Sequence, residues 1–302
     1  MISNAISRLN DIVVGKEMEI RLCLTCLVAR GHLLIEDQPG VGKTTLAHAL
    51  ARVLGLTYQR IQFTSDLLPA DVIGVSVFDR ATGGFRFHQG PVFSQLILAD
   101  EVNRANPKAQ SALLEAMEEG QVTADGSTYP LPMPFFVIAT QNPSHQIGTF
   151  PLPESQLDRF LMRIHLGYPD AAVERELLTG RDRRDLLQEL DPVLDPVMLA
   201  DLQKRVPAIH VSPALLDYLQ ALIAYSRDAP AFETGLSPRA AIGLLRAAQA
   251  WALLDGRKSV VPEDVQAVLA AVAAHRLRPV AEGGGESGSD IGEHLRQAVP
   301  VP

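Results

Sequence analysis

An eight-residue stretch, lying between an apolar segment and a helical one, constrains this chain more than any other feature. It reads Gln38-Pro-Gly-Val-Gly-Lys-Thr-Thr45. Gly40 and Gly42 carry no side chain, so successive backbone N–H groups can turn inward around an anion. A short apolar strand is expected before the loop, at His32 to Glu36, and a helix after it, at Thr45 to Gly55. Strand, glycine-rich loop and helix in this order predict an α/β fold with a phosphate-binding loop.

The side chains of this loop suit a nucleoside triphosphate and its magnesium ion. Lys43 is expected to reach the β- and γ-phosphates, and the Thr44 hydroxyl to complete the coordination of Mg²⁺. The general pattern has glycine where this chain has Asp37. Because Asp tolerates unusual backbone angles better than most residues, the loop is interpreted as a variant of that pattern. The nucleotide contacts predicted in the loop are Pro39, Gly40, Val41, Gly42, Lys43, Thr44 and Thr45.

Acidic and amide side chains follow two later apolar strands. Asp100 and Glu101 end the run Leu96-Ile-Leu-Ala-Asp-Glu101, and Asn142 follows Phe135 to Thr140. Asp100 can hold the magnesium ion through water, and Glu101 can orient and deprotonate a water for in-line attack on the γ-phosphate. Asn142 can hydrogen-bond both the γ-phosphate and that water. Each signal alone is weak, since Asp-Glu often caps a helix and Asn often begins a turn. Together with the loop they predict triphosphate hydrolysis.

Composition limits the classes of function. With 302 residues, of which 47% are hydrophobic and 21% charged, the chain can build two soluble globular domains. Its net charge of −8 and sequence pI near 5.5 argue against a broad nucleic-acid-binding face. No apolar run is long enough to cross a bilayer, and the N-terminus lacks the layout of an export signal, so a cytoplasmic protein is expected.

Two cysteines form a Cys-x-x-Cys within a helical pattern. Cys23 and Cys26 lie within Glu17 to Arg30, with no second cysteine pair or nearby histidine to complete a zinc site. We therefore interpret them as buried core thiols.

The predicted elements fall into an α/β part and a helical part. Nearly continuous apolar strands are typical of a parallel sheet that is covered on both faces. They are expected at His32 to Glu36, Thr57 to Phe63, Gln95 to Ala99, Phe135 to Thr140 and Leu161 to Leu166. After Gly167 only helical patterns follow, and four of them begin with proline at or near the first turn. They are Ala171 to Thr179, Pro196 to Lys204, Pro213 to Arg227, Pro238 to Leu254 and Pro262 to Ala274.

Two hairpin patterns interrupt the α/β part. Gly74 to His88 alternates around Thr82-Gly83-Gly84, and Gln121 to Leu131 turns at Asp125-Gly126. Both are expected to project from the sheet. From the residues alone, surface decoration is the ordinary interpretation of such hairpins.

Four longer motifs resemble the MoxR family of AAA+ ATPases, and the resemblance runs from about Asp11 to Pro302. The motifs are Glu101-Val-Asn-Arg-Ala-Asn-Pro-Lys-Ala-Gln-Ser-Ala-Leu-Leu-Glu-Ala-Met117, Ala139-Thr-Gln-Asn-Pro143, Gly148-Thr-Phe-Pro-Leu-Pro-Glu154 and Leu157-Asp-Arg-Phe-Leu161. The resemblance implies a P-loop NTPase core, with a central parallel β-sheet sandwiched by helices, and a C-terminal all-α lid domain. It also implies ATP and Mg²⁺ as cofactors and hydrolysis of ATP to ADP and phosphate in a hexameric ring.

In this family such a cycle serves chaperone-like remodelling, maturation or metal-cofactor activation of a client protein, often with a partner that carries a von Willebrand factor A domain. On this basis the expected domains are an α/β nucleotide-binding domain at 1–168, a connector at 169–190, the lid at 191–280, and a flexible linker with a short helix at 281–302.

The resemblance also assigns residues that spacing alone does not. Arg159 matches the arginine finger that reaches the γ-phosphate of the next subunit, and Arg239 matches the second sensor on the lid. A guanidinium suits both roles, because its fixed fork stabilises charge spread over phosphoryl oxygens. Without the resemblance, an ordinary ion pair of Arg159 with Asp158 or Glu154 would be preferred.

Further positions follow from the same resemblance. Val14 and Gly15 match the segment over the adenine, and the two hairpins match elements that line the pore or face the client in related rings. His145 stands where family members usually carry acidic residues, and we assign it no function.

Two alternatives from other functional classes remain. A nucleotide-dependent binding scaffold with little turnover could do without Glu101, yet Glu101 is present. A nucleic-acid motor is disfavoured by the acidic balance and by the lack of an aromatic and basic stripe.

Overall fold

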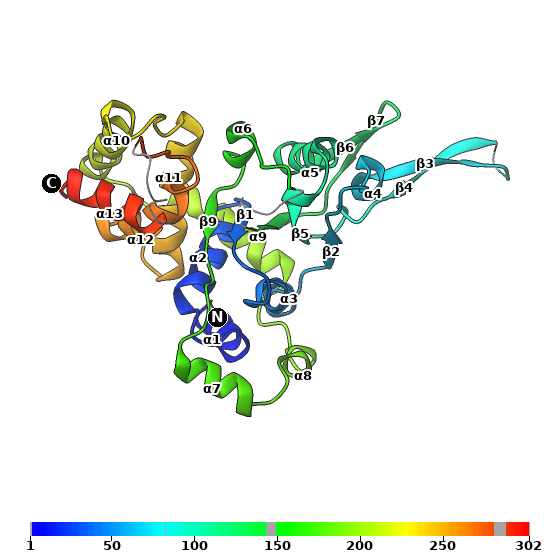
Figure 1. The fold of residues 1–302 in the computed structure, drawn as a ribbon, viewed down its shortest axis with the longest axis horizontal. Coiled ribbons are helices and arrows are strands. Elements are labelled where there is room, and N and C mark those ends of the chain that lie inside the picture. The colour runs from blue at the N-terminus through cyan, green and yellow to red at the C-terminus, as the bar shows by residue number, and fades with distance from the viewer. Residues whose placement is uncertain (1, 82, 143–148, 281–287, 302) are drawn as a thin grey trace. The chain divides into compact units, whose positions relative to one another are not determined.

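The computed structural model describes residues 2–81, 83–142, 149–280 and 288–301. Five strands form its main sheet (Figure 1), and their spatial order is β2 (Tyr58–Gln62), β5 (Leu96–Asp100), β8 (Phe136–Gln141), β1 (Leu33–Glu36) and β9 (Met162–Ile164). The pairs β2·β5 and β5·β8 are parallel, with Ile61 opposite Ala99 and Leu98 opposite Ile138. The predicted central parallel sheet is confirmed, and its five strands lie where the apolar runs indicate.

Burial differs between the centre and the edge of this sheet. All five residues of β5 are buried, whereas on the edge strand β2 only Ile61 is. Continuous apolar sequence therefore marks the central strands, and the alternating polar residues Arg60 and Gln62 mark the edge strand. The three predicted polar motifs lie at or directly after the ends of β1, β5 and β8. Carboxyl ends of parallel strands meet at one edge, which is where ligands bind in such sheets.

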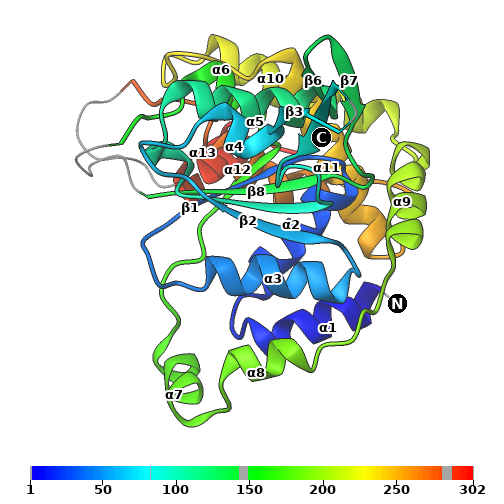
Figure 2. The same ribbon diagram turned by 90° about the vertical axis from the view of Figure 1, so that its right-hand side faces the viewer.

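Helices cover both faces of the sheet within the α/β unit. In Figure 2, α3 (Lys43–Val53) and α1 (Ile2–Ile12) lie on one side of strands β2 and β8, and α5 (Pro107–Glu119) on the other. The helix after the loop begins two residues earlier than expected, at Lys43. Helix α1 was not predicted. The unit also contains α4 (Pro69–Ile73), η1 (Val102–Arg104), α7 (Ala171–Thr179) and α8 (Arg183–Gln188).

Both predicted hairpins are present and project from this unit (Figure 1). One pairs β3 (Gly74–Asp79) with β4 (Gly84–Gln89), and the other pairs β6 (Gln121–Ala124) with β7 (Ser127–Pro130). Aromatic rings stand out on the first of them, where Phe78 is 51% and Phe85 76% exposed. The positive φ angles of Asp125 (49°) and Gly126 (77°) make the tight turn of the second.

Contacts along the chain define two compact units. The first comprises Met1–Ile20, Leu34–Leu152 and His165–Leu199, and the second comprises Arg21–Leu33, Pro153–Ile164 and Ala200–Pro302. Beyond β9, every named element of the described residues is helical. The elements whose bounds have not yet been given are α2 (Glu17–Val28), α6 (Glu154–Leu157), α9 (Pro196–Arg205), η2 (Val206–Ala208), α10 (Pro213–Asp228), α11 (Pro238–Leu254), α12 (Pro262–Ala273) and α13 (Gly288–Ala298).

Proline begins four of these helices, as predicted, and serine side chains cap two of them. Ser212 accepts a hydrogen bond from the Leu215 N–H ahead of α10, and Ser237 accepts one from the Ala240 N–H ahead of α11. Both are N-cap residues followed by proline, which lacks the N–H that such a position would leave unpaired.

The cysteine pair lies in the core, as interpreted from its helical setting. Cys23 and Cys26 form no disulfide and are fully buried on α2, and burial raises the pKa of Cys26 well above its usual value. The described residues hold no cluster of three His, Cys, Asp or Glu side chains that could bind a metal. None of their helices is long and apolar enough to span a membrane.

Candidate functional site

The predicted phosphate-binding loop has the backbone conformation that its glycines suggest. Gly40 and Gly42 have φ angles of 90° and 96°, in the region that favours glycine, and a Cβ added at either would meet no atom within 4 Å. Glycine is therefore needed for backbone conformation and not for space. Gly42 is also the N-cap of α3, so the unpaired N–H groups of an 11-residue helix open onto the loop.

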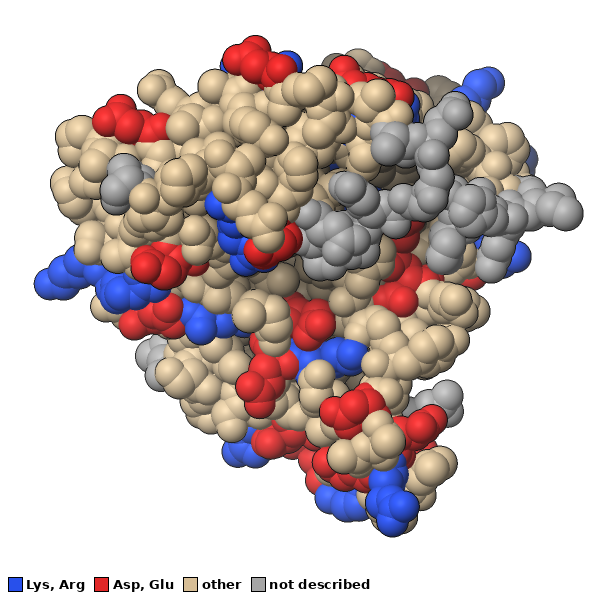
Figure 3. Space-filling model, turned by 60° about the vertical axis from the view of Figure 1, so that its left-hand side comes forward, with Lys and Arg blue, Asp and Glu red and all other residues tan. Residues whose placement is uncertain are grey.

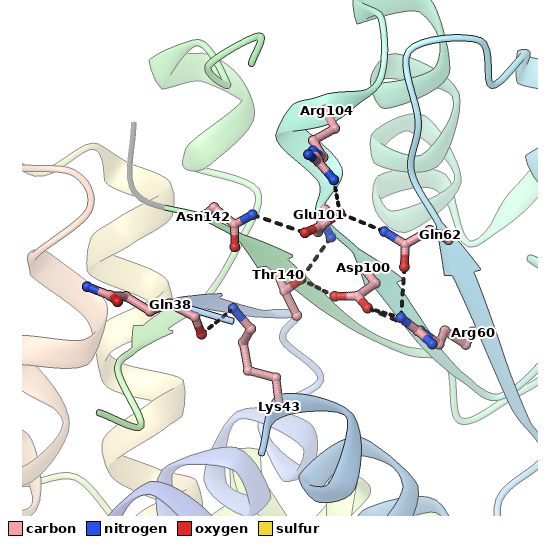
Figure 4. Close-up of polar contacts among 9 residues, drawn as sticks. All are labelled: Gln38, Lys43, Arg60, Gln62, Asp100, Glu101, Arg104, Thr140 and Asn142. Carbon is pink, nitrogen blue, oxygen red and sulfur yellow. Dashed lines mark hydrogen bonds and ion pairs between the residues drawn. The ribbon is translucent and has the colours of Figure 1, made fainter. Parts of the chain in front are cut away.

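Lys43 is the first residue of α3 and one of few buried charges, with 8% of its surface exposed. Its Nζ donates to the carbonyl oxygens of Asp37 (2.6 Å) and Gln38 (3.2 Å), as Figure 4 shows for Gln38. Burial lowers the pKa of Lys43, and the nearby carboxylates of Asp37, Asp100 and Glu101 oppose that shift. The loop thus folds around its own ammonium group.

Asp37, which replaces the glycine of the general loop pattern, has a structural role that the sequence alone does not reveal. Its φ angle is not among the positive values in the described residues, so tolerance of unusual backbone angles does not explain it. Instead its Oδ2 accepts hydrogen bonds from the backbone N–H groups of Leu166 (2.5 Å) and Gly167 (2.9 Å). The side chain ties the loop to the segment after β9.

This contact predicts that restoring the pattern's glycine will harm the fold. Asp37→Gly removes the acceptor of two backbone N–H groups, and Leu166 is 2% exposed. We expect the free energy of unfolding to fall by about 1–3 kcal/mol, the cost of an unsatisfied buried donor. Urea unfolding followed by circular dichroism measures it. Asp37→Asn keeps one acceptor oxygen and should lose less. A glycine variant as stable as the wild type would contradict the assignment.

Asp100, at the end of β5, is held through both carboxylate oxygens. Oδ1 accepts from the Thr140 hydroxyl at 2.6 Å, and Oδ2 accepts from Nε (3.1 Å) and Nη2 (2.6 Å) of Arg60. The Asp100 side chain is 11% exposed and that of Arg60 48%. This two-point contact from the neighbouring strand fixes the carboxylate at the carboxyl edge of the sheet (Figure 4).

Glu101 occupies a strained position directly after the strand. Its φ of 57° lies in the left-handed region, where a non-glycine residue costs on the order of 1–3 kcal/mol. Its N–H donates to the Thr140 hydroxyl at 2.8 Å, so that hydroxyl contacts both acidic residues. Its carboxylate accepts from the side-chain amides of Asn142 (3.1 Å) and Gln62 (2.8 Å) and from Arg104 (2.8 Å). Figure 4 shows these donors converging on Glu101 from β2, from η1 and from the residue that follows β8.

A cavity of about 390 Å³ brings these groups together, a volume in the range of small-ligand sites. Its lining is Pro39, Gly40, Gly42, Lys43, Thr44, Thr45, Arg60, Gln62, Asp100, Glu101 and Asn142. Val14, Gly15 and Val41 are not among these lining residues. The donor set fits a magnesium nucleotide. The positive-φ loop and helix N-terminus suit a polyphosphate, and the Thr44 hydroxyl and Asp100 suit Mg²⁺, which takes few protein ligands and keeps phosphate and water.

Comparisons with known proteins agree with this geometry. A family model described as "ATPase family associated with various cellular activities (AAA)" matches residues 32–162, and one for the AAA lid domain matches residues 224–295. Chaperone MoxR1 of Mycobacterium tuberculosis is 40% identical over 290 residues, covering 91% of this chain and 75% of that protein. The chain belongs to the MoxR family of AAA+ ATPases.

Two further proteins are similar to this chain over its whole length. The uncharacterised protein YeaC of Bacillus subtilis is 43% identical, covering 100% of this chain and 95% of YeaC. A crystal structure from Cytophaga hutchinsonii superposes with a TM-score of 0.91 at 38% identity, covering 100% of this chain and 94% of that one. The fold of this chain is thus shared over its whole length with a solved structure that is described as a putative ATPase.

The two arginines that MoxR resemblance singled out lie in the second unit. Arg159 follows α6 and is half-buried, and Arg239 is an exposed residue in the first turn of α11. Neither lines the cavity of the first unit. Their assigned functions stay predictions, as does that of Asn142. His145 lies outside the described residues.

Sequence reasoning missed four polar side chains around the acidic pair: Arg60, Gln62, Arg104 and Thr140. Arg60 and Gln62 alternate along β2, which indicates that they share one face of that strand. The sequence did not show that β2 lies beside β5, with Gln62 opposite Asp100.

Proposed function

We propose that this MoxR-family chain hydrolyses ATP to ADP and phosphate and uses the cycle to remodel a client protein. One observation carries the proposal: the loop, Lys43, the two carboxylates and the Asn142 amide line a single cavity at the carboxyl edge of the sheet. Phosphoryl transfer needs mainly positioning and charge stabilisation, which this arrangement can supply.

Each group in the cavity has a separate task in this proposal. The loop N–H groups and Lys43 would bind the β- and γ-phosphates, and Thr44 and Asp100 would hold Mg²⁺. Bound Mg²⁺ would offset charge on the phosphate oxygens. Glu101 would take the proton of the attacking water at its carboxylate, while Asn142, whose Nδ2 lies 3.1 Å from Glu101 Oε1, would orient that water.

The proposal includes a ring of several subunits, with six as the expected number, in the cytoplasm. Val14 and Gly15 would lie over the adenine, Arg159 would reach the nucleotide of the next subunit, and Arg239, on a lid at 191–280, would contact the nucleotide of its own. Support comes from the MoxR family and from the relative named as a chaperone. The client, and a partner with a von Willebrand factor A domain, belong to the same proposal.

Exposed aromatic rings on the first hairpin support a client-facing element. Phe85 is 76% exposed and Phe78 51%, and their rings touch edge to face with centroids 5.5 Å apart. Large apolar side chains at a projecting tip favour contact with another protein over decoration. The nucleic-acid motor gains no support, since on the face in Figure 3 Lys and Arg lie among Asp and Glu without forming one basic surface.

A subunit-mixing experiment tests hydrolysis across an interface. Arg159→Ala should still bind ATP but lose turnover on the order of 10³-fold, the usual effect of removing an arginine finger. Lys43→Ala subunits should bind no ATP yet carry an intact Arg159. Mixing the two variants should recover phosphate release, because each Lys43→Ala subunit can offer its arginine to a neighbour.

The matched control mixes Arg159→Ala with a Lys43→Ala/Arg159→Ala double variant, which brings no arginine and should give no recovery. Phosphate release is followed across mixing ratios. Equal rates in both mixtures would contradict action of Arg159 on a neighbouring subunit.

A further inference from the structure

A buried arginine in the second unit, Arg276, holds the segment that carries Arg159. The Arg276 side chain is 6% exposed. Its Nε donates to the carboxylate of Asp158 at 2.7 Å, and Nη2 donates to the carbonyl oxygens of Phe160 (2.6 Å) and Asp158 (3.2 Å). Nη1 donates to the Leu161 carbonyl at 3.1 Å and to that of Val272 in the same helical region. On either side of Arg159, the guanidinium therefore binds the Asp158 carboxylate and the backbone carbonyls of Asp158, Phe160 and Leu161.

A neutral histidine adds to this hold. His275 is 7% exposed and its Nε2 lies 3.0 Å from the Phe160 carbonyl oxygen. A carbonyl only accepts, so Nε2 carries the proton. Burial lowers the pKa of His275 well below its usual value, and Arg276 adds to that shift. His275 thus donates without a second buried positive charge beside Arg276.

The other oxygen of the Asp158 carboxylate reaches the start of helix α11. Ser237 Oγ donates to Asp158 Oδ2 at 3.1 Å, and Ser237 Oγ also accepts a hydrogen bond from the Ala240 N–H at 3.0 Å. Ser237 is thus both the N-cap of α11 and the partner of Asp158. Arg159 lies one residue after Asp158, and Arg239 two residues after Ser237. A single carboxylate therefore joins the two segments that carry the predicted finger and the predicted second sensor.

A nearby ion pair that is exposed to solvent provides a comparison for the buried contact between Arg276 and Asp158. Arg278 and Glu154 meet at 2.8 Å, but their side chains are 60% and 51% exposed. Such exposed pairs contribute little to stability or rigidity. Asp158, by contrast, is hydrogen-bonded through both carboxylate oxygens, and the side chain of its partner Arg276 is buried. Burial of a fully paired charge fixes geometry more than it adds stability.

We propose that Asp158, held by Arg276 and bonded to Ser237, is a positioning residue that couples the nucleotide contacted by Arg239 in its own subunit to the Arg159 that serves the next subunit. The coupling rests on the proposed function, which gives the two arginines different nucleotides. Contact of Arg239 with the γ-phosphate would fix the first turn of α11. Through its hydrogen bond to Ser237, Asp158 would then be ordered as well, and this would hold Arg159 in position to reach the nucleotide of the neighbouring subunit.

Hydrogen–deuterium exchange in an Arg159→Ala background tests this coupling without relying on activity. That background removes direct contact between the finger and the neighbour's phosphate. Adding adenylyl imidodiphosphate with Mg²⁺ should still slow exchange over residues 154–161, through Ser237 of the same subunit. In Arg159→Ala/Ser237→Ala this slowing should be lost, and Ser237→Thr in place of Ser237→Ala should restore it, because the hydroxyl returns.

Ser212 provides a matched control, since it caps α10 in the same way, is also followed by proline, and bonds the Leu215 N–H at 3.2 Å. Arg159→Ala/Ser212→Ala should keep the slowing over 154–161. Loss in both serine variants, or in neither, would overturn the coupling. Exchange over residues 38–45 reports nucleotide binding separately. Slowing there but not over 154–161 in Arg159→Ala would refute the coupling alone, and no slowing at 38–45 would refute nucleotide binding and the coupling together.

Discussion

Lys43→Ala is expected to abolish detectable ATP binding. Lys43 lines the cavity proposed for the nucleotide and is the cation at the N-terminus of α3, where phosphates would lie. Each charge-assisted hydrogen bond to a phosphate contributes about 1.5–3 kcal/mol, so losing two of them weakens binding by about 100-fold or more. Titration of a fluorescent ATP analogue measures the change.

The same substitution should leave the protein folded. A positive charge in the first turn of a helix opposes the helix dipole, and burial lowers the pKa of Lys43. We therefore expect the charge of Lys43 to lower the free energy of unfolding and not to raise it. Thermal unfolding of Lys43→Ala should therefore lie within a few degrees of wild type. Lys258→Ala, at an exposed lysine far along the chain, controls for loss of charge alone. Unchanged ATP affinity in Lys43→Ala would remove the basis of the proposed function.

Local pattern was enough to predict most of the fold. Apolar runs identified β5 and β8 because a central parallel strand is buried on both faces, and both strands are apolar up to the polar residues at their carboxyl ends. Proline at the first turn marked the starts of α10, α11 and α12 within one residue, because proline has no N–H and is tolerated only there. Helix α7 lies at its predicted bounds, and several other boundaries differ by one or two residues, where the ends of elements fray or continue.

Contacts made across the sheet could not be predicted in this way. Arg60 reaches Asp100 only because β2 pairs with β5, and strand order is a property of the whole fold. Asp37 illustrates the same limit. Its sequence position suggested a backbone substitute for glycine, while its carboxylate in fact binds N–H groups 129 and 130 residues later. Local rules describe which conformations a residue tolerates, and long-range hydrogen bonds decide which residue is needed.

Around Glu101, these long-range contacts all restrain the same residue. Thr140 bonds both acidic residues, and Gln62, Arg104 and Asn142 fix the direction of the Glu101 carboxylate. Such an arrangement keeps a strained residue, with φ of 57°, in a single orientation. A base that is already oriented loses little entropy when a water is aligned beside it. The network therefore accounts for the placement of Glu101 more fully than its position in the Asp-Glu pair does.

Glu101→Gln should separate binding from hydrolysis. The amide keeps the size of the side chain and one oxygen that can accept from Asn142, so the cavity and ATP affinity should be preserved. It cannot take a proton from water, and removing a general base lowers turnover by about 10²–10⁴-fold. Steady-state phosphate release and the ATP analogue titration together measure both effects. ATP-bound subunits that cannot turn over should accumulate as an assembled ring, visible by size-exclusion chromatography with light scattering.

Glu119→Gln, at the exposed end of α5, controls for the loss of one carboxylate and should hydrolyse ATP as the wild type does. Phosphate release that is equally slow in the wild type and in Glu101→Gln would favour the binding scaffold over the ATPase, because Glu101 would then have no base function to lose. Normal turnover in Glu101→Gln would have a different meaning. It would show that the proton leaves by another group, and among the residues that line the cavity Asp100, bonded on both oxygens by Thr140 and Arg60, is poorly placed to accept it. The proposed hydrolysis therefore depends on the oriented carboxylate of Glu101.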